Sequence, residues 1–73
     1  MNRIHYTKPE MEKILSIVNF DEIEEPVLIG KWNKKTTKEL GIEIKVSDAT
    51  INRALKRALD KIKDAYDKNL IKF

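Results

Sequence analysis

Residues 36–55, TTKELGIEIKVSDATINRAL, carry the clearest structural pattern in this chain. Two runs with apolar residues at helical spacing are separated there by a short polar turn. Leu40 and Ile44 lie four residues apart in the first run, and Ile51 begins the apolar stripe of the second. Ser47 stands just before the second run, where its hydroxyl can accept a hydrogen bond from an unpaired backbone N–H group. The segment is therefore predicted to form two helices joined by a tight turn.

The second of these helices is predicted to be long. No Gly or Pro interrupts the helical spacing of its apolar residues, which are Ile51, Ala54, Leu55, Ala58, Leu59, Ile62, Ala65, Tyr66 and Leu70. The steps of four and three between positions 51, 55, 58, 62 and 65 form a heptad-like seam. Such a seam either packs against a helix near the amino terminus or pairs with the same helix of a second chain, which gives a homodimer through Ile51–Leu70.

The amino-terminal part predicts a capped helix that begins after Thr7. Thr7 and Glu10 have the spacing of a capping box, in which each side chain accepts a hydrogen bond from the other residue's backbone N–H. One apolar stripe follows, made of Met11, Ile14, Leu15 and Val18. We expect this helix to end near Asn19 or Phe20.

Residues 21–32 allow two interpretations. Asp21 can cap a helix, but Pro26 interrupts it. We therefore place Pro26 in the first turn of a helix that runs to about Trp32, since proline is tolerated there. Positions 26–32 also fit a short strand, because β-branched and aromatic residues favour strands. With the helix preferred, the whole chain predicts one all-α domain: a compact three- to four-helix helix-turn-helix domain with a long C-terminal helix.

The composition narrows the function classes. The 73-residue chain has no cysteine and a single histidine, so disulfides and His-rich zinc sites are not available to it. No apolar run approaches the roughly 18 residues that span a membrane, and the first ten residues lack the apolar core of a signal peptide. We expect a cytoplasmic protein with no cofactor, no metal and no membrane partner.

Catalytic constellations are absent from the sequence. No nucleophile stands with a base and an orienting group, and no glycine-rich loop could cradle a phosphate. Asp60, Asp64 and Asp67 are spaced by about one helical turn, but lysines interleave with them, so ion pairs explain these carboxylates more simply than a metal site. The chain is therefore predicted not to be an enzyme.

Charge is distributed unevenly along the chain. Residues 1–30 carry three basic and six acidic side chains, whereas residues 31–73 carry twelve basic and six acidic ones. A basic segment of this kind suggests a surface that meets an anionic partner, and nucleic acid is the commonest such partner.

The motif resembles the helix-turn-helix of bacterial and phage transcription regulators, and most closely region 4 of sigma factors and the small phage regulators built like it. Their usual run is roughly T-x-x-E-L-A, then G-V-S, then T-V-x-R, and two departures in residues 36–53 count against the match. Lys45 replaces the glycine of the turn, where a positive φ is unfavourable for a side chain. Gly41 replaces an alanine and costs up to ~1 kcal/mol of helix propensity, but it supplies the small residue needed where the two helices approach most closely.

The resemblance implies that the helix beginning at Ser47 enters the major groove of double-stranded DNA. The residues it places against base edges are Asp48, Ala49, Thr50, Asn52 and Arg53. The residues it places near phosphates are Lys34, Lys35, Lys38, Lys56 and Arg57. Asparagine suits adenine and arginine suits guanine, whereas the methyl groups of alanine and threonine suit thymine.

These expectations describe a sequence-specific DNA-binding transcription regulator from a bacterial or phage-like source. It would act as a roadblock or recruit RNA polymerase. The main alternative is a protein-interaction module, a phage-type inhibitor or adaptor that binds a host protein through a helical surface. The acidic amino-terminal part and Lys45 keep this alternative open. A third is a structural dimerisation module based on the seam alone.

Overall fold

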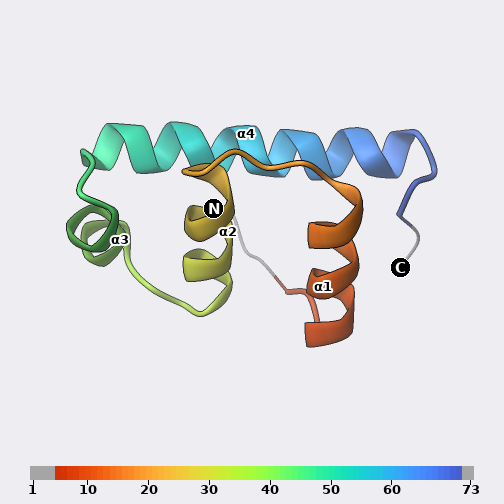
Figure 1. Ribbon diagram of the computed structural model, residues 1–73, viewed down its shortest axis with the longest axis horizontal. Helices are drawn as coiled ribbons and strands as arrows, with labels where there is room; N and C mark the ends of the chain where they lie inside the picture. The colour runs from red at the N-terminus through yellow and green to blue at the C-terminus, as the bar shows by residue number, and fades with distance from the viewer. Residues whose placement is uncertain (1–4, 72–73) are drawn as a thin grey trace.

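The computed structural model describes residues 5–71. Over this range it contains the helices α1 (Lys8–Ile17), α2 (Glu24–Trp32), α3 (Thr37–Ile44) and α4 (Asp48–Asp67). Figure 1 shows α4 along the long axis of the molecule, with α1 and α2 side by side against it at a steep angle and α3 below its first turns. No strand occurs within the described residues, so the predicted all-α fold with a long C-terminal helix is confirmed.

The start of α1 follows the sequence pattern, and its end does not. The N–H of Thr7 donates to Glu10 at 2.8 Å and the N–H of Glu10 donates to the Thr7 hydroxyl at 3.4 Å, which completes the capping box. The helix ends at Ile17, two or three residues earlier than predicted, because Val18 already has an extended backbone. The chain leaves the helix there, and the carbonyl of Asn19 accepts a hydrogen bond from Lys61 at 3.1 Å.

Residues 26–32 are helical. The predicted cap at Asp21 and the position of Pro26 both contribute to the start of this helix. The Asp21 carboxylate accepts hydrogen bonds from the N–H groups of Ile23 at 2.9 Å and Glu24 at 2.6 Å. The Glu24 carboxylate in turn accepts one from the N–H of Asp21 at 3.1 Å. Pro26 lies in the first turn of α2, where the missing N–H costs no helical hydrogen bond.

The apolar stripe of α4 contributes residues to two adjoining hydrophobic clusters. The first lies against α1 and α2 and contains Met11, Ile14, Val18, Leu28, Ala58, Ile62, Ala65 and Ile71. The second lies against α2 and α3 and contains Val27, Leu40, Ile51, Ala54 and Leu55. All five positions of the heptad-like seam are buried in these clusters, so the chain's own helices occupy the seam.

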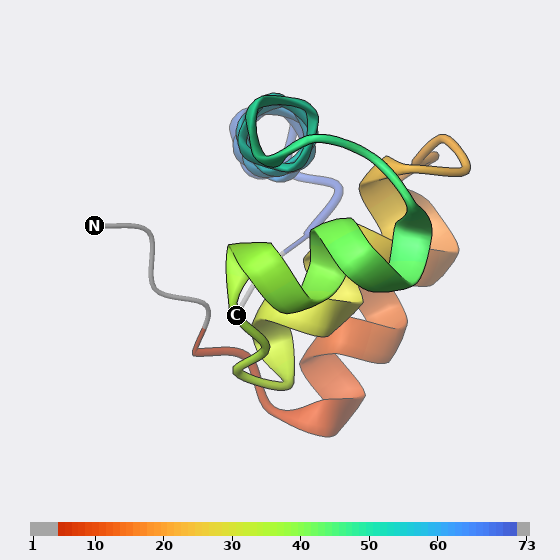
Figure 2. The same ribbon diagram turned by 90° about the vertical axis from the view of Figure 1, so that its left-hand side faces the viewer.

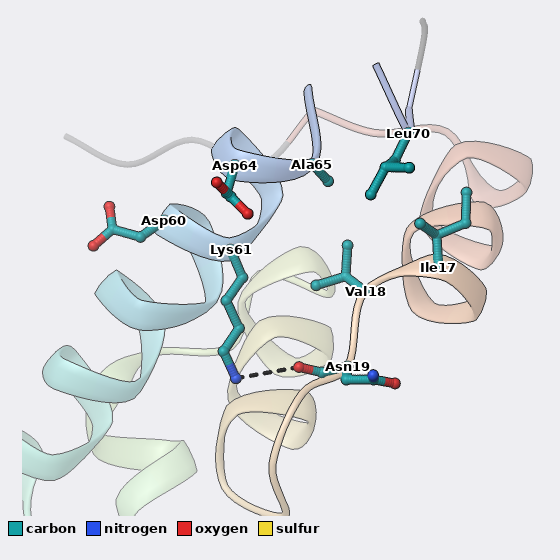
Figure 3. A pocket seen from close by; sticks show the side chains of 8 residues that line it. All are labelled: Ile17, Val18, Asn19, Asp60, Lys61, Asp64, Ala65 and Leu70. Carbon is teal, nitrogen blue, oxygen red and sulfur yellow. Dashed lines mark hydrogen bonds between the residues drawn. The ribbon is translucent and has the colours of Figure 1, made fainter. Parts of the chain in front are cut away.

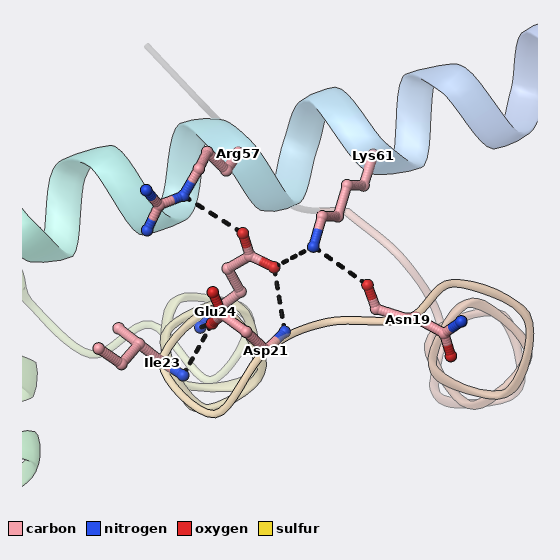
Figure 4. A network of polar contacts seen from close by, with 6 residues as sticks. All are labelled: Asn19, Asp21, Ile23, Glu24, Arg57 and Lys61. Carbon is pink, nitrogen blue, oxygen red and sulfur yellow. Dashed lines mark hydrogen bonds and ion pairs between the residues drawn. The ribbon is translucent and has the colours of Figure 1, made fainter.

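Glu24 is a buried charge that ties the start of α2 to the middle of α4 (Figure 4). Its side chain is only 2% exposed, and its carboxylate forms ion pairs with Lys61 and with the Nε of Arg57 at 3.3 Å. Burial acts to raise the pKa of Glu24, but the hydrogen bonds from Lys61 and from the N–H of Asp21 outweigh it and lower the pKa below its usual value. A buried carboxylate is stable only with such partners, so this cluster sets how α2 sits on α4.

Replacing Glu24 by glutamine is expected to destabilise the fold by about 1–3 kcal/mol, because hydrogen bonds to charged partners are lost at a buried position. Glu25 is the matched control, since it is exposed in the same turn, and Glu25→Gln is expected to change stability by no more than about 0.5 kcal/mol. Urea denaturation of the three proteins measures both values. Equal stabilities for the two variants would contradict the assigned role of Glu24.

Acidification is expected to weaken the same cluster. The pKa values of Asp21 and Glu24 are lowered in the folded chain, so the unfolded chain binds more protons in the acid range and stability there rises with pH. The stabilisation is complete above the ordinary carboxyl pKa values of about 4 and is lost as the pH falls through the lowered values. Urea denaturation at a series of pH values should show a smaller acid loss for Glu24→Gln than for the natural chain, and identical pH profiles would refute this.

Candidate nucleic-acid interface

Residues 45–47 join α3 to α4 in a tight turn. The N–H of Val46 donates to the carbonyl of Gly41 at 3.1 Å, which closes the end of α3. Lys45 has φ 65° and ψ 46°. This is the left-handed conformation expected at this position, where the helix-turn-helix pattern has a glycine. The Ser47 hydroxyl accepts a hydrogen bond from the N–H of Thr50 at 3.2 Å and so caps α4, as predicted.

Gly41 lies where the two helices of the motif approach each other. A Cβ atom at this position would stand 3.0 Å from the carbonyl oxygen of Val46 and 3.3 Å from a carboxylate oxygen of Asp48. These distances are tighter than ordinary van der Waals contacts, and the first involves backbone that cannot rotate away. The predicted need for a very small residue is therefore borne out by the geometry. Leu40 of α3 and Ile51 of α4 pack in the same buried cluster and hold the two helices together.

Four side chains share an exposed face on the first half of α4. Ala49, Asn52, Arg53 and Lys56 are all exposed and follow the spacing i, i+3, i+4 and i+7, which places them on one side of a helix. The other side of the same turns is the buried stripe. Of the residues predicted to meet base edges, the structure thus brings Ala49, Asn52 and Arg53 together on one open surface.

The other two predicted base contacts are placed differently. The hydroxyl of Thr50 lies 2.9 Å from that of Ser47, so Thr50 takes part in the cap of α4 and is half-buried. Asp48 is exposed, but one of its carboxylate oxygens lies beside Gly41 on α3. Thr50 thus belongs to the cap of α4, and Asp48 lies close to α3.

The predicted phosphate contacts divide into two groups. Lys38 and Lys56 are exposed, on the first turns of α3 and on the open face of α4, and neither takes part in an ion pair within residues 5–71. Arg57 is paired with Glu24, and Lys35 is paired with Glu43 at 2.7 Å.

Lys34 and Lys35 belong to the loop between α2 and α3, which lies at the end of α2 remote from α4 (Figure 1). Figure 2 shows this loop and the first turn of α3 on the opposite side of the molecule from the loop that leads into α2. Lys34 has φ 66° and is exposed. The structure therefore separates the lysines of this loop from the open face of α4.

Charge also changes along α4. Residues 48–57 carry three basic side chains against Asp48 alone, whereas residues 58–68 carry three basic and three acidic ones. Two acidic residues of α3 are also engaged locally: Glu39 accepts from the N–H of Thr36 at 3.0 Å, and Glu43 pairs with Lys35. The open face of α4 is consequently most positive near its amino-terminal half.

The buried Glu24 cluster was not predicted from the sequence. Asp21 was expected to cap a helix, but nothing in the sequence indicated that Glu24 is buried or that Arg57 and Lys61 are its partners, 33 and 37 positions away. The interleaved lysines of α4 were also only partly understood. Asp64 pairs with Lys68 at 3.0 Å, whereas Lys61 turns to Glu24.

No known protein family, curated protein or solved structure matches this chain. None of the described helices has the length and apolar character needed to cross a membrane. Within residues 5–71, no three His, Cys, Asp or Glu side chains are grouped so that they could hold a metal ion.

Lys45→Gly is expected to stabilise the fold by about 0.5–1 kcal/mol. The left-handed conformation costs a residue with a side chain about 1–2 kcal/mol, and glycine adopts it freely but loses about 0.5–1 kcal/mol of chain entropy. Lys38→Gly is the matched control, because Lys38 lies in a right-handed turn of α3 and should lose about 1 kcal/mol. Thermal denaturation distinguishes the two, and a destabilised Lys45→Gly would show that the turn has a different conformation.

Proposed function

We propose that this chain is a sequence-specific DNA-binding transcription regulator that reads the major groove with the first half of α4. The observation that supports this most is the open face formed by Ala49, Asn52, Arg53 and Lys56 beside the α3–α4 turn. An α-helix fits the major groove, and residues near its amino terminus are the ones that reach base edges in helix-turn-helix proteins.

The chemistry of this face suits base recognition. The Asn52 amide can donate to and accept from adenine, and the Arg53 guanidinium can donate two hydrogen bonds to guanine. The methyl group of Ala49 can contact the methyl group of thymine. Three neighbouring side chains with different base preferences would recognise a short base sequence, whereas charge alone would attract any duplex.

Lys56 and Lys38 supply the contacts to the DNA backbone in this proposal. Both are exposed and lack an intramolecular carboxylate partner within the described residues, so their charges are available to phosphates. Phosphate contacts fix the register of the protein on the duplex and do not read sequence. Arg57 has a smaller part, because Glu24 already holds its guanidinium.

The rest of the fold would keep this face rigid. Ser47 caps α4, the α3–α4 turn is closed by a backbone hydrogen bond, and the far side of α4 is buried against α2 and α3. A rigid reading surface avoids part of the entropy loss on binding.

Arg53→Ala is expected to weaken binding to a preferred operator by about 1–3 kcal/mol and to relax the choice of base at one position. The operator is first selected from random duplexes with the natural chain, and fluorescence anisotropy then measures the affinity of each variant. An unchanged affinity and an unchanged base preference for Arg53→Ala would contradict the assignment of α4 as the reading helix.

Lys56→Ala should instead weaken binding to all duplexes alike and reduce the slope of log K against log salt by about 1. Lys13→Ala is the matched control, since Lys13 is exposed on α1 and should leave both affinity and slope unchanged. Binding that does not respond to salt, or no binding to any duplex at low salt, would exclude DNA and favour the protein-interaction module.

A further inference from the structure

A cavity of about 400 Å³ lies between the end of α1 and the second half of α4 (Figure 3). Its walls are largely apolar, because Ile17, Val18, Ala65 and Leu70 line it. Leu70 is 54% exposed although it follows a helix that packs in the core. The cavity is open to solvent and has room for an apolar side chain of a partner.

We call this cavity the socket. Asp60 and Asp64 project from α4 at its edge (Figure 3). Asp60 takes part in no ion pair within residues 5–71, whereas Asp64 is paired with Lys68 at 3.0 Å. Lys61 also lines the socket, but its ammonium group is bound to Glu24 and to the carbonyl of Asn19 (Figures 3 and 4). The chemistry of the socket therefore suits an apolar group that is accompanied by a positive charge.

A surface with the complementary character occurs on α3, and we call it the knob. Ile42 is 71% exposed, the largest exposure among the large apolar side chains of the described chain. Lys38 precedes it by four residues, and Lys45 follows it by three in a strained left-handed conformation. Glu43 is in an ion pair with Lys35, and Glu39 accepts a hydrogen bond from the N–H of Thr36. Within residues 5–71 neither carboxylate forms an ion pair with Lys38 or Lys45.

The knob and the socket lie at opposite ends of the molecule. Figure 1 shows α3 at one end of the long axis, under the first turns of α4, and the end of α1 beside the last turns of α4 at the other. One copy cannot bring its own knob and socket together, so a contact between them has to join two copies. Ile42 and the walls of the socket are both apolar, and the charges of Lys38 and Lys45 are opposite to that of Asp60.

We propose that copies of this chain associate head to tail, with Ile42 of one copy seated in the socket of the next. Such a contact uses two different surfaces, so each added copy leaves one knob and one socket open and the assembly can grow. The contact is small, and small interfaces of this kind are weak and transient. This inference does not depend on DNA binding.

Sedimentation equilibrium of the natural chain at low salt tests the proposal. The average mass should rise from 8.6 kDa with concentration and, at millimolar concentration, pass twice that value, because the assembly is open-ended. Ile42→Ser removes the knob and Asp60→Lys with Asp64→Lys reverses the charge of the socket, and each variant alone should remain at 8.6 kDa. All three positions are exposed, and circular dichroism verifies that the variants keep their helices.

An equimolar mixture of the two variants is the decisive sample. It contains one intact knob and one intact socket per pair, so it should form dimers and nothing larger. Glu22→Lys with Glu25→Lys is the matched charge control, since both residues are exposed outside the socket, and it should associate like the natural chain. A natural chain that stays at 8.6 kDa, an Ile42→Ser variant that associates like the natural chain, or a mixture that stays monomeric would overturn the proposal.

Discussion

Every other helix of this fold packs against the apolar stripe of α4. Ile51, Ala54 and Leu55 meet α2 and α3, whereas Ala58 and Ile62 meet α1 and α2. A helix that is buried along one stripe exposes the opposite one, so the periodicity that builds the core also selects the residues that face solvent. The candidate interface is thus a consequence of packing. Because α4 is a single helix without a break, the stripe and the open face keep their relation over its whole length.

Glu24 decides which basic side chains of α4 are held in ion pairs and which remain free on its surface. Its buried carboxylate holds Lys61 and the Nε of Arg57, which fixes α2 on α4 and takes up two cations. Arg53 and Lys56 take part in no ion pair within residues 5–71, so their charges remain available on the open face. The same buried group therefore contributes to the stability of the fold and to the charge pattern from which the proposed function is argued.

Patterns within a single helix or turn were predictable from the sequence, and contacts between distant segments were not. The caps at Thr7 and Ser47 follow from local rules of helix capping. The small residue at Gly41 and the left-handed conformation of Lys45 were indicated by the helix-turn-helix pattern. The end of α1 was placed too late, since the chain turns away at Val18 and its next contact, the hydrogen bond from Lys61 to the carbonyl of Asn19, comes from a distant part of the sequence. Likewise, of the predicted phosphate contacts, Lys38 and Lys56 are exposed and without an ion pair within residues 5–71, whereas the ion pairs of Lys35 and Arg57 could not be foreseen from the sequence.

The proposed function requires that the first half of α4 is the surface that meets DNA. The most direct measurement is a ¹H–¹⁵N correlation spectrum of the chain recorded during titration with a mixed-sequence duplex. We expect the backbone signals of residues 48–57 and of the first turn of α3 to shift together, while those of α1 stay in place. Shifts confined to α1 and α2, or no shifts at low salt, would contradict the assignment of α4 as the DNA-binding surface.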